Sequence, residues 1–120
     1  ATDLDWVILE GVADSQVDPG DPVWFGEGAR GTDAGYKLRS SSTWDTPGGT
    51  DKFGFSALAA GFTYYGLSAN KGAFAHFWTS SQSEAPWNPW MHWMRHDYSN
   101  PGRDYFLDEN GRSLRCIRNQ

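Results

Sequence analysis

Short aromatic-rich runs separated by turn-forming residues constrain the fold of this chain more than any other feature of its sequence. Between residues 53 and 118 such runs recur at spacings of roughly ten residues, a pattern typical of antiparallel strands. The second half is therefore predicted to form a twisted antiparallel sheet, with the last run paired inside it. The predicted strands are residues 53–58, 61–65, 73–79, 90–95, 105–107 and 114–118.

The first half of the chain lacks this pattern. Residues 3–10 predict a short helix with acidic residues in its first turn, and Gly11 is its expected end. Residues 14–35 are rich in glycine, proline and aspartate and predict a long loop, held by Trp24 and Phe25. Short helices and loops followed by strands indicate an α+β fold and not a parallel βαβ fold.

The composition limits the size and the partners of the molecule. A chain of 120 residues forms one domain, here residues 1–120, and its 7 Trp, 7 Phe and 5 Tyr supply much of the apolar surface. The net charge of −5, with no basic run, argues against binding to nucleic acid or to an anionic membrane. No apolar stretch reaches the roughly 18–20 residues that a membrane-spanning helix needs, so no membrane insertion is expected.

Several segments of the chain form a familiar set of motifs in a fixed order. They are residues 3–6 (DLDW), 35–40 (GYKLRS) with Trp44, 49–58 (GTDKFGFSAL) with Gly61 and Phe62, 77–81 (FWTSS), Trp90 and 113–118 (SLRCIR). The GFSAL string within residues 49–58 is the most specific of them, and Gly54 in it and Gly61 after it would permit close turns. Together these segments resemble a known family of bacterial extracellular modules, the Fibrobacter succinogenes major paralogous domain.

The resemblance implies a C-type-lectin-like fold, distantly related to formylglycine-generating-enzyme-like domains. It also implies a bacterial protein that is secreted or held at the cell surface, as a lipoprotein or other surface protein. By the same resemblance, the chain is expected to correspond to the larger, C-terminal part of the family domain, without the N-terminal segment in which family members carry a cysteine. Cys116 is thus expected to be unpaired, or paired to a segment outside this chain, and to lie buried in the last strand. Arg112 stands where the family commonly has an aromatic residue.

The motif residues also predict the core. Seven large side chains are expected to be mostly buried because they anchor the helix and the strands. They are Trp6, Leu9, Phe55, Leu58, Trp78, Trp90 and Leu114. Both faces of the predicted strand 90–95 carry large side chains, so this strand is either buried on both sides or presents one face as a contact surface.

Rings between the motif positions are the best candidates for ligand contact. Aromatic rings stack on sugar faces while amide and guanidinium groups bond hydroxyls, and the same composition suits protein interfaces. Pro86, Pro89 and Pro101 would stiffen the connecting backbone and reduce the entropy that binding costs. The predicted ligand-binding residues are Trp87, Asn88, Trp93, Tyr98, Arg103 and Tyr105.

Metal ligands are weakly indicated. His92 and His96 have the i, i+4 spacing of a helical metal clamp, but the neighbouring Trp90 and Trp93 favour a strand, so no metal is expected there. Asp108 and Asn110 lie in a segment that suits either a calcium loop or an ordinary turn, and the turn is favoured. His76, flanked by aromatic residues, is expected to be half-buried with its hydrogen bonds satisfied.

Catalysis has little support in the sequence. The serines after Trp78 lack a nucleophile elbow, and Cys116 alone does not supply the cysteines of formylglycine-generating chemistry. The sequence favours a non-catalytic binding or adhesion module that recognises a glycan or a protein surface outside the cell. The alternative is a structural subunit or tip domain of an extracellular assembly, with self-association; an enzyme ranks last.

Overall fold

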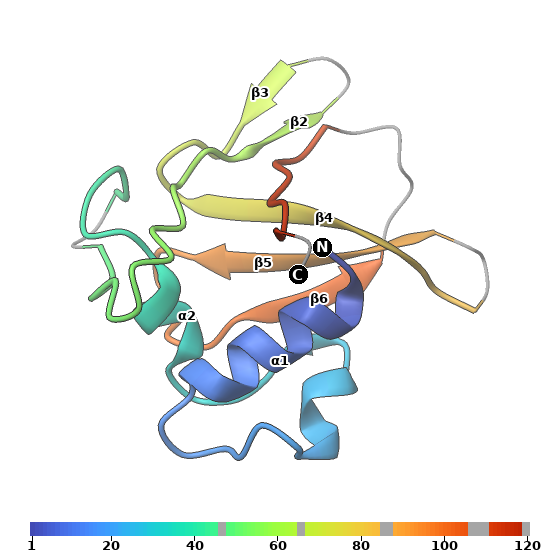
Figure 1. The fold of residues 1–120 in the computed structure, drawn as a ribbon. Coiled ribbons are helices and arrows are strands. Elements are labelled where there is room, and N and C mark those ends of the chain that lie inside the picture. The colour runs from blue at the N-terminus through green and yellow to red at the C-terminus, as the bar shows by residue number, and fades with distance from the viewer. Residues whose placement is uncertain (46–47, 65–66, 85–87, 106–110, 119–120) are drawn as a thin grey trace.

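The computed structural model describes residues 1–45, 48–64, 67–84, 88–105 and 111–118 (Figure 1). Helices come first and antiparallel strands second, which confirms the predicted α+β class. None of the helices within these ranges is both long and apolar enough to cross a membrane. The elements are α1 (Asp3–Ala13), the 3-10 helix η1 (Pro22–Phe25), β1 (Gly28–Ala29), α2 (Ala34–Leu38), β2 (Phe62–Tyr64), β3 (Leu67–Ala69), β4 (Phe74–Gln82), β5 (Pro89–Arg95) and β6 (Gly102–Tyr105).

The main sheet has four strands in the order β1-β6-β5-β4, and every neighbouring pair is antiparallel. Helix α1 contacts β4 and β5, and the view in Figure 1 shows it lying across the sheet. The β2–β3 hairpin forms a separate two-stranded sheet beside β4. The sheet thus has one face under α1 and one face turned away from it.

Helix α1 begins at a capping box and runs past its expected end. The Asp5 backbone N–H donates to the Thr2 hydroxyl, and the Asp5 carboxylate accepts the Thr2 backbone N–H over 2.7 Å. The helix continues to Ala13, so the prediction that Gly11 ends it is wrong. Gly11 is needed inside the helix because a Cβ there would lie 2.7 Å from the Cα of Pro19, whose loop crosses at that point.

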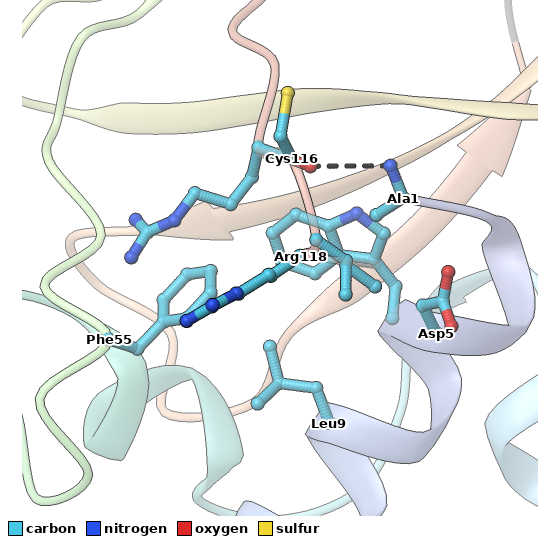
Figure 2. A pocket seen from close by; sticks show the side chains of 9 residues that line it. Ala1, Asp5, Leu9, Phe55, Cys116 and Arg118 are labelled. Carbon is cyan, nitrogen blue, oxygen red and sulfur yellow. Dashed lines mark hydrogen bonds between the residues drawn. The ribbon is translucent and has the colours of Figure 1, made fainter. Parts of the chain in front are cut away.

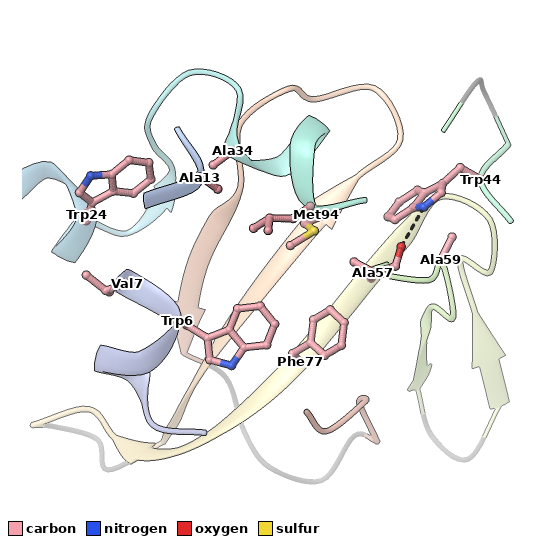
Figure 3. Close-up of a cluster of buried hydrophobic side chains, with 12 residues drawn as sticks. Trp6, Val7, Ala13, Trp24, Ala34, Trp44, Ala57, Ala59, Phe77 and Met94 are labelled. Carbon is pink, nitrogen blue, oxygen red and sulfur yellow. Dashed lines mark hydrogen bonds between the residues drawn. The ribbon is translucent and has the colours of Figure 1, made fainter. Parts of the chain in front are cut away.

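Trp6 lies at the centre of the core (Figure 3). Its ring centroid lies 4.8 Å from that of Phe77 and 5.5 Å from that of Phe55, and it stacks on His92 at 5.5 Å. Trp24 is also fully buried, as its role in holding the loop predicted, whereas Phe25 is exposed. The core therefore joins α1 and the loop after it to the inner face of the sheet.

The other predicted core residues are less buried than expected. Leu9, Phe55, Trp78 and Trp90 are only partly buried, while Trp6 alone of the seven is fully so. The predictions for two leucines are wrong, since Leu58 is 53% exposed and Leu114 is 73% exposed.

The predicted last strand, residues 114–118, does not form. Ser113 makes one parallel bridge with Phe77, and the chain then leaves the edge of β4. The reason is competition for that edge, because the next free β4 donor, the Ser80 N–H, bonds to the carbonyl of Ala1 over 3.0 Å. Leu114 therefore lies at the surface.

Residues 53–58 do not form a strand either. Ala57 makes a single bridge with Arg39. The Asp51 carboxylate accepts both the backbone N–H and the hydroxyl of Ser56, and this closes a local turn in place of a strand.

Candidate functional site

The structure separates the predicted ligand residues into two groups. Trp87, like the weak calcium candidates Asp108 and Asn110, lies outside the described residues. Side chains alternate along β5 and β6, so Trp93 points away from α1 and Arg103 points toward it.

On the outer face, Trp93 is held by its own neighbours. Its Nε1 donates to Asp104 over 2.7 Å, and its ring covers Gly102 so closely that a Cβ there would lie 1.8 Å from the ring. The Tyr98 ring lies 5.9 Å from the Trp93 ring, and the Arg95 guanidinium lies 4.2 Å above Tyr98. This outer cluster is held by contacts among its own members and with Asp104, and Trp93, Arg95 and Tyr98 do not line the cavity that contains Arg103 and Tyr105.

On the α1 side, Arg103 and Tyr105 line a polar cavity of about 410 Å³ at the end of the sheet. It gathers side chains from η1 and the turn after it, from the end of β4, and from β5 and β6. We call it the polar cavity; it is lined by Phe25, Glu27, Gln82, Ser83, Glu84, Trp90, Arg103 and Tyr105.

Two rings and one guanidinium form the fixed wall of the polar cavity. Trp90 and Tyr105 are register partners across β5 and β6, and their rings meet edge to face at 4.9 Å. The Arg103 guanidinium lies 3.5 Å from the Trp90 ring centroid, within cation–π range. Its Nε and Nη2 donate to the two Asp3 carboxylate oxygens over 2.8 and 2.7 Å, so its charge is compensated from beneath.

The same wall contains a buried hydroxyl, that of Ser83. Ser83 is only 3% exposed, and its Oγ has no hydrogen-bond partner among the residues that the structure describes. Its backbone N–H donates to the carbonyl of Asn88 over 2.8 Å, which fixes the position of the side chain. Asn88, a predicted ligand residue, thus contributes its backbone there. Buried polar groups are nearly always bonded, so an unpaired one beside a cavity suggests a missing partner.

A bulge in β4 turns this end of the strand toward the cavity. The pairing of β4 with β5 shifts register between Trp78 and Gln82. The Thr79 hydroxyl donates to the carbonyl of Trp90 over 2.9 Å and accepts the Ser81 N–H over 3.2 Å, which stabilises the irregular segment. Residues 77–81 (FWTSS) therefore stabilise the part of β4 that leads into the wall of the cavity.

Sequence reasoning found Arg103 and Tyr105 but missed the other chemical groups of the polar cavity. Glu27 reaches it because the adjacent Gly28 pairs with Arg103 across β1 and β6. Nothing in the local sequence connects Glu27 with Ser83 or Glu84, which are far away in the chain.

Beneath the polar cavity lies a cluster of buried ionisable side chains that sequence reasoning also missed. His92 Nδ1 lies 2.7 Å from Glu10 Oε1, and its Nε2 lies 2.8 Å from Asp3 Oδ1. Arg30 Nη2 donates to Glu10 over 2.5 Å, and Arg103 Nη2 donates to Asp3 over 2.7 Å. Because each carboxylate is paired with an arginine, both ring nitrogens of His92 must donate, and the ring is an imidazolium. Asp3 and Glu10 share the buried face of α1 with Trp6, a signal that could have revealed the cluster.

The cluster shifts the pKa values of His92 and Asp3 in opposite directions. Burial by itself lowers the pKa of His92, but the charge of Glu10 and the hydrogen bonds to Asp3 and Glu10 outweigh it and raise the pKa above 6.5. Burial by itself raises the pKa of Asp3, yet the hydrogen bonds from Arg103 and His92 hold it well below its usual range.

We expect the stability of the protein to fall as pH rises above about 6.5. The folded-state pKa of His92 is raised above its ordinary value of 6.5, so its stabilising contribution is complete below that pH. The contribution is then lost as pH rises through the folded-state pKa. Urea unfolding at a series of pH values measures this, and His92→Gln should flatten the alkaline side of the profile.

His76 provides the control, because its pKa moves the other way. Burial, with a smaller contribution from the charge of Arg112, lowers the pKa of His76 to about 3. Its contribution is present above the ordinary value of 6.5 and is lost as pH falls toward about 3. His76→Phe should therefore reduce the loss of stability as pH falls below 6.5 and leave the alkaline side unchanged. A variant His92→Gln that still loses stability at alkaline pH would contradict the assignment.

The expectation that His76 has satisfied hydrogen bonds is wrong. Neither ring nitrogen has a hydrogen-bond partner among the described residues. The ring stacks on Phe62 at 4.5 Å and meets Phe74 edge to face at 5.1 Å, so aromatic contacts replace polar ones. His92 and His96 do not share a site, since His92 belongs to the buried cluster. Within the described ranges no group of three or more His, Cys, Asp or Glu side chains is placed to hold a metal ion.

A second cavity, of about 370 Å³, lies between α1 and residues 115–118 (Figure 2). Its walls are mostly apolar and include Trp6, Leu9 and Phe55. Cys116 lies at this cavity and is exposed, so its predicted burial is wrong, because the chain has left the sheet beyond Ser113. The polar cavity suits hydroxyl-rich ligands better than this one does.

Comparison with family models, with curated proteins and with solved structures found no match to this chain.

Proposed function

We propose that this chain is a non-catalytic binding module with a C-type-lectin-like fold, that it acts outside the cell, and that it binds a glycan in the polar cavity. One observation carries the choice of site: the buried Ser83 hydroxyl, which has no partner among the described residues, lies in the same wall as the Trp90–Tyr105 ring pair. A sugar presents hydroxyls for the former and C–H faces for the latter.

The rest of the wall fits the same ligand. Glu27 and Glu84 are exposed at the cavity and offer acceptors for sugar hydroxyls. Arg103 is fixed by Asp3 before any ligand arrives, so little ordering is needed on binding. A concave, pre-formed and polar site of this kind suits a small saccharide better than a flat protein surface.

Replacing Tyr105 by alanine should weaken glycan binding by about 1–3 kcal/mol, as truncation of a contact ring typically does. A glycan array identifies the ligand, and calorimetry then measures the affinity of each variant. Tyr98→Ala is the matched control, because Tyr98 belongs to the outer cluster; it should bind as the unchanged protein does. Loss of binding in Tyr98→Ala alone would place the ligand on the outer cluster instead.

A second candidate function, a subunit of an extracellular assembly, rests on the outer side of α1. Leu4, Ile8 and Val12 lie at i, i+4 and i+8 along the helix, and each is more than half exposed. Such a stripe matches a second copy of itself across a two-fold axis. Light scattering on the calorimetry sample separates the candidates, because a protein that stays monomeric at every concentration is not an assembly subunit.

A further inference from the structure

The polar cavity carries negative charge that nothing in the described structure compensates. Glu27 and Glu84 line it, both are exposed, and neither forms an ion pair within the described ranges. The cation of the wall, Arg103, is already paired with Asp3 over 2.7 Å. A ligand in the cavity therefore meets two free carboxylates and one compensated guanidinium.

Aromatic rings accompany these carboxylates. Phe25, Trp90 and Tyr105 all line the cavity, and Phe25 is 52% exposed. Rings beside carboxylates are the combination that recognises an ammonium group, through cation–π attraction and charge-assisted hydrogen bonds. Arg103 already makes the first of these contacts, since its guanidinium lies over the Trp90 ring at 3.5 Å and over the Phe25 ring at 5.8 Å.

Ser83 indicates the remainder of the ligand. Its buried Oγ has no partner within the described ranges, and a hydroxyl, amide or water could accept its O–H, whereas a bare alkylammonium group offers no acceptor. A ligand that combines a cation with hydroxyls satisfies both the carboxylates and Ser83.

We propose that the glycan bound in the polar cavity carries a free amino group, as a glucosamine oligomer does. The ammonium lies between Glu27 and Glu84 beside the rings, and a sugar hydroxyl bonds to Ser83. This inference rests on the proposed function and specifies the chemistry of the same site.

The test compares the binding of three trisaccharides to the intact chain by calorimetry: a glucosamine trimer, its N-acetylated counterpart and a glucose trimer. At a pH where the amine is protonated, the free amine should bind about tenfold more tightly than the other two, since hydrogen bonds to charged groups are stronger. Added salt should reduce this preference.

The variant Glu84→Gln removes one charge and keeps the shape of the side chain, so it should reduce the preference for the amine by several-fold. Asp18→Asn is the matched control, because it changes the net charge equally at an exposed position that does not line the cavity; it should leave the preference unchanged. Equal binding of the free and acetylated trimers would overturn the proposal that the ligand carries a free amino group, and glycan binding in the polar cavity would remain supported. Binding of none of the three would overturn the amine-bearing ligand, and the proposed function would fail with it if the glycan array also showed no binding. Tighter binding of a lysine-rich peptide would overturn both.

Discussion

Replacing Arg30 by methionine should lower the free energy of unfolding by about 3–5 kcal/mol, the usual cost of removing one partner from a buried ion pair. Arg30 and Glu10 have almost no exposed side-chain surface, and their charged atoms lie 2.5 Å apart. Without Arg30, His92 is the one ion-pair partner left to the Glu10 carboxylate among the described residues. Arg30 also donates to the carbonyls of Trp24 and Pro101, which would lose a partner.

A matched pair of variants tests this explanation by urea unfolding. Lys37→Met removes the same charge from the Lys37–Asp33 pair, which is partly exposed and 3.4 Å apart; it should cost only about 0.2–1 kcal/mol. Adding Glu10→Gln to Arg30→Met should recover part of the lost stability, because no unpaired carboxylate then remains. Equal costs for Arg30→Met and Lys37→Met would mean that burial of the pair contributes nothing.

The strands that were predicted correctly can be recognised from their own residues. Residues 90–95 lie within β5, and residues 73–79 overlap β4 from Phe74 onward. Their aromatic and β-branched side chains favour a strand at these positions. The C-terminal strand failed because its outcome depends on Ala1, whose carbonyl takes the β4 donor that residues beyond Ser113 would need. That competition is between opposite ends of the chain, and no local pattern reports it.

For the candidate site, too, the residue types were predictable from the sequence and their arrangement in space was not. Arg103 and Tyr105 were predicted because aromatic and guanidinium side chains between motif positions suit ligand contact. Their grouping with Trp93 and Tyr98 was not confirmed, since alternation along β5 and β6 places the side chains of Arg103 and Trp93 on opposite faces. Ligand binding by Arg103 and Tyr105 remains a prediction.

The buried cluster was missed for another reason. The acidic residues in the first turn of α1 were interpreted as stabilising the N-terminus of the helix. This is the role of Asp5, whose carboxylate completes the capping box. Asp3 instead turns inward to Arg103 and His92. An aspartate that caps the helix and an aspartate that points into the core look alike in sequence. Asp3 differs from Asp5 in lying on the same buried face of the helix as Trp6.

Replacing Trp6 by alanine should also cost about 3–5 kcal/mol, the range for truncating a buried aromatic side chain. Trp6 is 2% exposed and its ring contacts Phe55, Phe77 and His92. The change removes the ring that joins α1 to β4 and β5 and leaves a cavity in the core. Since a domain of this kind has a margin of only about 5–15 kcal/mol, the variant should unfold at a clearly lower urea concentration.

Trp78→Ala and Trp6→Phe show why burial and packing, and not the presence of tryptophan, decide the cost. Trp78 is only partly buried, with the Arg112 guanidinium 4.4 Å from its ring, so its truncation should cost roughly 1–2 kcal/mol. Trp6→Phe keeps an aromatic ring and removes an Nε1–H that is buried without an acceptor in the described residues; it should cost less than half as much as alanine, because an unpaired buried donor itself destabilises the fold. If Trp78→Ala proved as damaging as Trp6→Ala, the centre of the core would lie nearer to the outer face of the sheet than the ring contacts of Trp6 place it.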